Sequence, residues 1–288
     1  MKISSVVLTH AHPELTRDTV NSIKDFVGSQ VLVLVDEIGW EDFKKFPNAE
    51  KGFLHAHKKS PYRNYALGLK KLYEQWPNSD WFLYTEYDCV FVSDKFKEEL
   101  KAAEERKAWL VGVDLRRFPF QFPKLFEIIE QPTPKYSYYF LGCCHFHSGP
   151  FIRKLAELNF FDKFLEATKT YEKGKFPGYD RYAFEEELWP TLATALGGNL
   201  YELSCWKSNE RQEYQLPLSD PIAYYAGKDH DTWRGKFRKY PIRNAPEIKS
   251  YEIYPEASIV HPLKELDCTV RLELAVKRKN HLKRKLFI

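Results

Sequence analysis

The 288-residue sequence has few of the features that mark secreted or membrane-spanning proteins. Its five cysteines include no CxxC pair, and an odd, sparse set of this kind does not indicate a disulfide framework. No charged segment followed by an apolar one opens the chain, and no run approaches the roughly 20 apolar residues that a membrane helix needs. We therefore expect reduced thiols and a cytoplasmic location.

Aromatic residues, in contrast, are abundant. Hydrophobic residues make up 43% of the chain and aromatic residues 16%, which is enough large apolar surface for a sizeable core and argues against global disorder. Tyrosine and tryptophan also suit a concave binding site, because each combines a flat apolar face with a polar edge.

The positive charge is concentrated in the last 18 residues. Residues 271–288 hold seven Lys or Arg and one Glu, which leaves 37 basic and 39 acidic residues in the rest of the chain. This tail also has leucines and a valine at nearly helical spacing, so it predicts either a basic amphipathic helix on an anionic membrane surface or a solvated helix packed by its apolar side chains. A nearly neutral body argues against a nucleic-acid surface across the whole protein.

Apolar runs and helical periodicities alternate through the first 115 residues. The strands predicted from apolar runs are 3–8, 31–35, 81–84 and 109–113, and the helices predicted between them are 15–26, 64–73 and 93–107, the last capped by Ser93. Runs without polar alternation are typical of parallel strands that are covered on both faces. This order predicts an α/β fold with a mostly parallel, Rossmann-like central sheet flanked by helices.

The second half is less regular. The patterns predict a long loop over 116–136, a strand over 138–147, a helix over 150–158, a helical segment over 182–196 that Pro190 kinks or divides, and strands over 199–203 and 257–264. Residues 207–254 show no clear pattern.

The strongest chemical signal is the segment Trp81–Val92, WFLYTEYDCVFV. Glu86 and Asp88 follow a buried strand, and on an extended backbone residues i and i+2 point to the same side. Open α/β sheets bind ligands at the carboxyl ends of their strands. Two carboxylates there suit Mg²⁺ or Mn²⁺, which in turn binds a diphosphate.

Over most of its length the chain resembles the glycosyltransferases of the GT-A fold, particularly those of the family-2 type. That family begins with a strand, a helix and a second strand that ends in Asp, and these are similar to Val6–Asp36 here. Its Arg-Asn segment, which opens a helix, is similar to Tyr62–Gly68. About 20 residues later, Glu86-Tyr87-Asp88 stands where that family has Asp-x-Asp. The resemblance implies one catalytic domain over 1–270, with a nucleotide-sugar-binding half at 1–115, an acceptor-side half at 116–270 and the tail at 271–288.

The resemblance also implies residue roles. Thr9 and Asp36 would contact the nucleoside of the donor. Arg63 would hold the nucleotide or order its loop, and Asn64 would start the helix.

Asp88 would be the principal ligand of a Mn²⁺ or Mg²⁺ ion. Glu86 would reach the ribose, or the metal through water. Here the chain departs from the family motif, because Glu replaces the first Asp and is one methylene longer. His261, delivered by ASIVHPLK, is similar to a late histidine that returns to the metal in this family, and an imidazole ligand favours Mn²⁺.

Three consecutive acids, Glu185–Glu187, begin another predicted helix, where they would interact favourably with the helix dipole. Inverting enzymes of the family place an acidic pair here that takes the proton from the acceptor hydroxyl. We favour Glu186 as this general base, with Glu185 as the alternative.

His-x-His occurs three times, at His10/His12, His55/His57 and His145/His147. Cys143 and Cys144 beside the last pair suggest a zinc site. However, adjacent residues of a strand point to opposite sides, so both cysteines could not bind one ion without a turn. His10 and His12 follow the first strand and could line the donor cleft.

Together these features predict a metal-dependent, inverting glycosyltransferase that uses a nucleotide-sugar donor, with a UDP-sugar favoured, and a glycan or lipid-linked acceptor. A nucleotidyltransferase is disfavoured because residues 9–20 contain no Gly and only one basic residue, Arg17. Two alternatives stay open: a glycosyltransferase acting on modified DNA, and a non-catalytic module that binds nucleotides or glycans.

Overall fold

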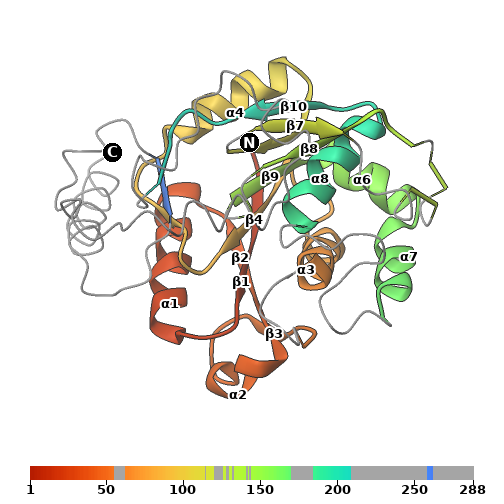
Figure 1. Cartoon of the computed structure of the whole chain (residues 1–288). Coiled ribbons are helices and arrows are strands. Elements are labelled where there is room, and N and C mark those ends of the chain that lie inside the picture. Colours follow the sequence, from red (N-terminus) through yellow and green to blue (C-terminus); the bar gives the residue numbers. More distant parts are fainter. Residues whose placement is uncertain are drawn as a thin grey trace, which may run out of the picture.

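The computed structural model describes residues 1–54, 62–113, 115–119, 126–127, 130–131, 133–140, 142, 144–169, 184–208 and 258–261. A seven-stranded sheet lies at the centre, in the order β10-β6-β9-β4-β1-β2-β3 (Figure 1). Its strands are β1 (Ile3–Thr9), β2 (Gln30–Val35), β3 (Ala49–Lys51), β4 (Trp81–Glu86), β6 (Ala108–Gly112), β9 (Cys144–Ser148) and β10 (Asn199–Glu202).

All strands of this sheet except β9 run in the same direction. β3, β2, β1 and β4 pair in parallel, β9 is antiparallel to both β4 and β6, and β10 is parallel to β6. The predicted α/β fold with a mostly parallel central sheet is therefore confirmed. Strands from both halves of the chain build this sheet, because β9 and β10 come from beyond residue 115.

Helices cover both faces of the sheet (Figure 1). They are α1 (Pro13–Ser22), which continues into a π-helical turn η1 (Ile23–Val27), the 3₁₀ turn η2 (Glu37–Gly39), α2 (Trp40–Phe43), α3 (Tyr62–Gln75), α4 (Phe96–Glu105), α6 (Gly149–Glu157), α7 (Phe160–Ala167) and α8 (Phe184–Ala195). None of the helices in the described part of the chain is long and apolar enough to cross a bilayer.

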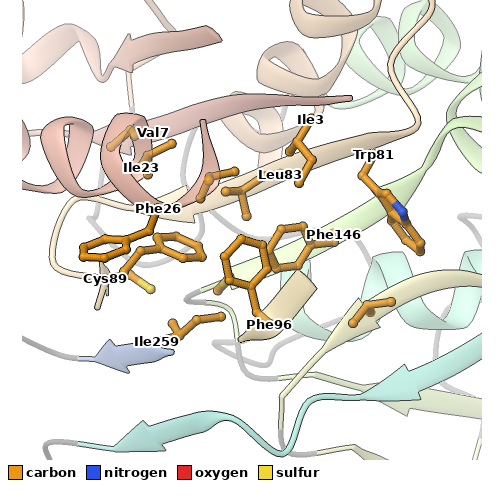
Figure 2. Close-up of a cluster of buried hydrophobic side chains, with 14 of the residues drawn as sticks. Ile3, Val7, Ile23, Phe26, Trp81, Leu83, Cys89, Phe96, Phe146 and Ile259 are labelled. Carbon is orange, nitrogen blue, oxygen red and sulfur yellow. The ribbon is translucent and has the colours of Figure 1, made fainter. Parts of the chain in front are cut away.

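Alternate side chains of the central strands enter two separate cores. Val6 and Leu34 pack with α3, α6, α7 and α8 on one face, whereas Val7 and Val33 pack with α1, η1 and α4 on the other. Figure 2 shows this second core, in which Phe96 of α4 lies against Phe146 of β9. Because both faces are covered, side chains on both sides of the strands are buried, which explains why the strands lack the regular polar alternation of a half-exposed sheet.

Two small sheets complete the fold. β5 (Val90–Phe91), β12 (Ile259–His261) and β11 (Trp206–Ser208) form one, and β7 (Arg116–Pro119) and β8 (Tyr136–Tyr139) form an antiparallel ribbon. β5 follows directly on the segment that carries the candidate metal ligands. This arrangement brings the second half of the chain to the end of β4.

Four sequence predictions need correction. Arg116–Pro119 is a strand rather than part of a loop, and the predicted strand 138–147 is divided between β8 and β9, which belong to different sheets. α8 runs through Pro190 as one helix, so the division into two helices is wrong. Ser93 does not cap α4, because its hydroxyl bonds the hydroxyl of Ser258 at 2.7 Å.

The basic tail, 271–288, lies outside the described residues.

Candidate functional site

The carboxyl ends of β1 and β2 place Thr9 and Asp36 side by side. The two strands pair in parallel up to Thr9 and Val35, and the backbone N–H of Asp36 donates to the Thr9 carbonyl at 2.8 Å. Both residues are buried. The Asp36 carboxylate accepts from the backbone N–H of Ile38 at 3.0 Å, and the Thr9 hydroxyl lies 3.0 Å from that of Thr16 in α1. Each predicted nucleoside contact thus also orders the loop that follows its strand.

The loop after β1 is held between two other segments. A side chain at Gly39 would place its Cβ 2.2 Å from the His10 carbonyl oxygen, so only glycine allows η2 to approach this loop so closely. On its other side the loop meets Tyr87, whose ring lies 5.3 Å from that of His10 and 5.9 Å from that of His12. The two loop histidines therefore contact the segment that carries Glu86 and Asp88.

That segment is a tight turn and not an extended strand. β4 ends at Glu86, and the backbone N–H of Cys89 donates to the Glu86 carbonyl at 3.1 Å, which closes a turn over Tyr87 and Asp88. The expectation of an extended backbone through Asp88 is therefore wrong. The turn is also fixed to β1, because the N–H of Tyr87 donates to the Leu8 carbonyl at 3.1 Å. Asp88 is buried, with 3% of its surface exposed, and Glu86 is half-buried.

β12 brings His261 to the same turn from a position more than 170 residues later. β12 is antiparallel to β5, with Ile259 opposite Phe91 and Val260 opposite Val90. His261 follows Val260 in β12, and Val90 lies two residues after Asp88, so the backbone of His261 is close to the end of the turn. The pairing places the backbone only, and the side chain of His261 is not among those described.

Arg63 and Asn64, in the first turn of α3, hold the loop after β3. The Asn64 amide accepts from the Phe53 N–H at 2.6 Å and donates to the Phe53 carbonyl at 2.9 Å. The Arg63 guanidinium lies 4.1 Å from the centre of the Phe53 ring and donates to the Leu165 carbonyl at 3.4 Å. The neighbouring Gly52 donates to the carbonyl of Val35, so both residues act on the loop beside Asp36.

Glu186 reaches the site through a contact that the sequence did not indicate. One carboxylate oxygen of Glu186 accepts from the backbone N–H of Gly142 at 2.9 Å, and its carbonyl accepts from the N–H of Phe140 at 3.0 Å. β9 begins just after Gly142 and places Cys144 opposite Thr85, near the end of β4. Glu186 is therefore held at the same edge of the sheet as Glu86 and Asp88.

Gly142 was missed as a site residue. A Cβ there would lie 2.9 Å from Cγ of Glu186, so a side chain would displace the carboxylate. The only local signal is a single glycine after the aromatic run that ends at Phe140. Of the other two acids, Glu187 is buried, and the structure describes the helical backbone of Glu185 but not its side chain.

His145 and His147 belong to a buried polar cluster. Both imidazoles hydrogen-bond the hydroxyl of Tyr65 in α3, His147 through Nε2 at 3.0 Å and His145 through Nδ1. Burial, together with the nearby His145, holds the pKa of His147 well below 6.5, so His147 is neutral. Among the described side chains, no three His, Cys, Asp or Glu gather as ligands of one metal ion.

The cysteines in the described part of the chain are buried thiols: Cys89, Cys144 and Cys205. Burial raises the pKa of Cys144 well above 9.0, which keeps the thiol protonated. Cys143 and Cys268, like His55 and His57, lie outside the described residues.

The structure thus gathers most of the predicted site residues at one edge of the sheet. Thr9 and Glu86 end β1 and β4, Asp36 follows β2, and Asp88 lies in the turn after β4; the Glu186 carboxylate binds Gly142, just before β9. Two carboxylates at such an edge fit Mg²⁺ or Mn²⁺, because these ions are commonly held by one or two carboxylates together with phosphate oxygens of a substrate. Fewer than three gathered protein ligands are therefore compatible with such a site.

No protein-family model matches the sequence, and no curated protein matches it. Among solved structures, it is similar to a glycosyltransferase involved in the glycosylation of the major capsid of PBCV-1. The two share 12% sequence identity, the match covers 98% of this chain and 100% of that chain, and the TM-score is 0.44. It is also similar to the glycosyltransferase GlyE of Streptococcus pneumoniae TIGR4. The two share 11% sequence identity, the match covers 99% of this chain and 64% of that chain, and the TM-score is 0.45.

A third similar structure is S. aureus TarS 1–349, with 14% identity, 54% of this chain and 49% of that chain covered, and a TM-score of 0.32. The match thus spans about half of the solved TarS chain. TarS has also been solved in complex with UDP-GlcNAc. At these identities and TM-scores the likenesses assign neither a family nor an activity to this chain.

Proposed function

We propose that the protein is a glycosyltransferase that uses a divalent metal ion and transfers a sugar from a nucleoside-diphosphate sugar to an acceptor hydroxyl with inversion. The observation that supports the proposal is that the Gly142 segment, which binds the Glu186 carboxylate, precedes β9 at the same end of the sheet where β4 enters the Glu86–Asp88 turn. A diphosphate leaving group and a weak hydroxyl nucleophile need two such acidic elements. A UDP-sugar is the favoured donor, and a glycan or lipid-linked glycan the favoured acceptor.

In this proposal the nucleoside lies across the ends of β1 and β2, against Thr9 and Asp36. The buried Asp36 is already oriented by the N–H of Ile38, so it offers its remaining acceptor capacity in a fixed direction. Arg63 and Asn64 support this place indirectly, because both hold the Phe53 backbone. Of the two roles considered for Arg63, ordering the loop agrees better with its contacts than binding the nucleotide.

Asp88 would be the principal ligand of Mn²⁺ or Mg²⁺, with His261 as a second ligand and Glu86 bound to the ribose or, through water, to the metal. When bound, the metal ion neutralises the charge that develops on the departing diphosphate. The turn fixes Asp88 in three ways: through the Cys89–Glu86 hydrogen bond, through the Tyr87–Leu8 hydrogen bond and through the pairing of β5 with β12. This rigidity would keep the carboxylate in place before the donor arrives.

Glu186 would act as the general base. The Gly142 N–H orients the carboxylate, which would accept the proton of the acceptor hydroxyl. The hydroxyl oxygen then bonds to the anomeric carbon while the bond from that carbon to the diphosphate oxygen breaks on the opposite face. A positioned base of this kind accelerates the reaction by roughly 10²–10⁴-fold. Glu185 remains the alternative.

Donor cleavage in two conservative variants tests the proposal. Release of UDP from UDP-sugars in Mn²⁺, with water as the acceptor, should fall at least 100-fold in Glu186→Gln, because an amide accepts no proton. The amide oxygen of the new glutamine can still accept from the Gly142 N–H. The local structure should therefore be kept, and UDP binding should persist. Asp88→Asn should lose the Mn²⁺-dependent part of both UDP binding and UDP release.

The control is Glu157→Gln, which changes an exposed carboxylate on α6 and should leave both readouts unaltered. Thermal melting of each variant separates loss of function from loss of fold. Undiminished release in Asp88→Asn contradicts the metal assignment, and undiminished release in Glu186→Gln moves the base to another residue.

A further inference from the structure

The β7–β8 ribbon has one face that combines cations with tyrosine rings. Arg117 pairs with Tyr138 in the antiparallel register, so the two side chains share a face, and Tyr136 lies on that face two residues earlier. Arg117 is exposed, and Tyr136 and Tyr138 are half-buried. Ser137, which points to the opposite face, is fully buried. We call Arg117, Lys135, Tyr136 and Tyr138 the Arg117 face.

Two positive charges on this face gather at one ring. The Arg117 guanidinium lies 4.8 Å and the Lys135 ammonium 5.2 Å from the centre of the Tyr136 ring. Cation–π contacts of this kind place the charges without neutralising them. The two strands contain no Asp or Glu, so the face has no anion of its own.

Some other surface cations of the described residues are paired with carboxylates, whereas others, such as Arg106 over the Tyr201 ring, are not. Lys44, Lys51 and Lys154 each form an ion pair with a carboxylate, at 2.6, 2.6 and 3.6 Å. In the parts of the chain that the structure describes, neither Arg117 nor Lys135 has a carboxylate within ion-pair distance. Their charge is therefore available to an external anion.

The ribbon is attached to the helix that carries the proposed base. The N–H of Tyr138 donates to the hydroxyl of Thr191 in α8 at 2.8 Å, and the N–H of Phe140, one residue after β8, donates to the Glu186 carbonyl at 3.0 Å. Figure 1 shows β8 lying beside α8. A molecule bound on the ribbon would lie along the segment that leads to the Glu186–Gly142 contact.

We propose that the Arg117 face binds carboxylate groups of an anionic saccharide and that this saccharide is the acceptor, an inference that rests on the proposed function. Arginine binds carboxylates through two parallel N–H donors, and the half-exposed Tyr138 ring offers a flat surface for the sugar. Phosphate dianions are usually held by several converging N–H groups, whereas this face offers two single charges around one ring. A membrane or nucleic acid would need a wider surface of cations that lack carboxylate partners.

Titration of the full chain with defined sugars tests this inference. The probes are trigalacturonate, which carries three carboxylates, and maltotriose, a neutral sugar of the same length, measured calorimetrically at 50 and 200 mM NaCl. Trigalacturonate should bind more tightly, and the higher salt should weaken it because exposed charges are screened. The double change Arg117→Gln, Lys135→Gln should weaken its binding about tenfold, about threefold for each exposed charge. Lys44→Gln, which breaks an ion pair elsewhere, is the matched control and should have no effect.

Several results would overturn the inference: equal binding of both sugars, binding of neither, a double variant that binds like the wild type, or displacement by inorganic phosphate at matched ionic strength. Tight binding of anionic vesicles or an oligonucleotide in place of the sugar would also overturn it. UDP release to water, assayed in the same variants, should be unchanged. If the wild type releases no UDP, the proposed function fails whatever the sugar titration shows, so the two failures can be distinguished.

Discussion

The two faces of the central sheet differ in chemistry, and β9 shows the difference within five residues. Its Cys144 and Phe146 enter an apolar core between the sheet and α4 (Figure 2), whereas His145 and His147 point to the other face and hydrogen-bond Tyr65. The Glu86–Asp88 turn leads into β5, which packs in the apolar core, and Glu186 lies on α8 over the mixed face. The proposed metal site thus adjoins an apolar core, and the proposed base lies on a helix that packs over a core in which polar groups are mixed with apolar ones.

This difference indicates that the two halves of the site are fixed by different forces. Burial of aromatic rings positions the turn that carries Asp88, and such packing does not depend on pH. Hydrogen bonds from Tyr65 to His145 and His147 tie α3 to β9 beneath α8, and adding a proton to the buried His147 imidazole is unfavourable. Changes on the two faces should therefore have effects of different size and different pH dependence.

The largest expected effect comes from truncating the apolar face. Phe146→Ala should lower the free energy of unfolding by about 3–5 kcal/mol, because the fully buried ring stacks on Phe96 at 5.5 Å and contacts Phe91 of β5. Urea denaturation at constant pH measures the change. The exposed Ile38→Ala is the control and should shift stability by less than about 0.5 kcal/mol. Equal small effects in both variants would show that the apolar core does not hold the turn.

A smaller effect, with a characteristic pH dependence, is expected on the mixed face. The folded pKa of His147 lies well below 6.5, so the unfolded chain binds a proton that the native state does not bind as pH falls below 6.5. Stability is unaffected above that pH and declines below it. At pH 5.5, which is one unit below the ordinary pKa of 6.5, His147 should lower the free energy of unfolding by about 1.4 kcal/mol relative to its value at pH 7.5.

Urea denaturation of the wild type and His147→Gln at both pH values isolates this contribution from that of other groups. The variant retains a side-chain donor for Tyr65 but does not titrate. The free energy of unfolding that it loses between pH 7.5 and 5.5 should therefore be smaller than that of the wild type, by about 1.4 kcal/mol. Parallel pH profiles of the two proteins would show that His147 is not kept neutral by the fold.

Much of the fold could be predicted because the first half follows local rules. β1, β2 and β4 coincide with apolar runs, and the helices between them with helical periodicity. The failures have long-range causes. The predicted strand 138–147 is interrupted because Glu186 holds the Phe140–Gly142 segment, and Ser93 bonds Ser258 instead of capping α4. No window of sequence contains both partners of such contacts.

The candidate site divides in the same way. Thr9, Asp36, Glu86 and Asp88 could be placed at one edge because they directly follow strands. The pairing of β12 with β5, which brings His261 toward Asp88, joins segments with no shared local signal, and it was suggested only by the family resemblance. Gly142 could not be assigned, because its importance depends on the space that Glu186 occupies.

The central claim is that the Asp88 turn binds a divalent cation together with a nucleoside diphosphate, and thermal unfolding tests it most directly. UDP and Mn²⁺ together, at about 100 times the Kd, should stabilise the protein by roughly 2.7 kcal/mol. UDP with EDTA, or Mn²⁺ alone, should give much less, and Asp88→Asn should abolish the joint effect. An equal shift with UDP in EDTA, or no shift with any nucleoside diphosphate and Mn²⁺, would contradict the claim.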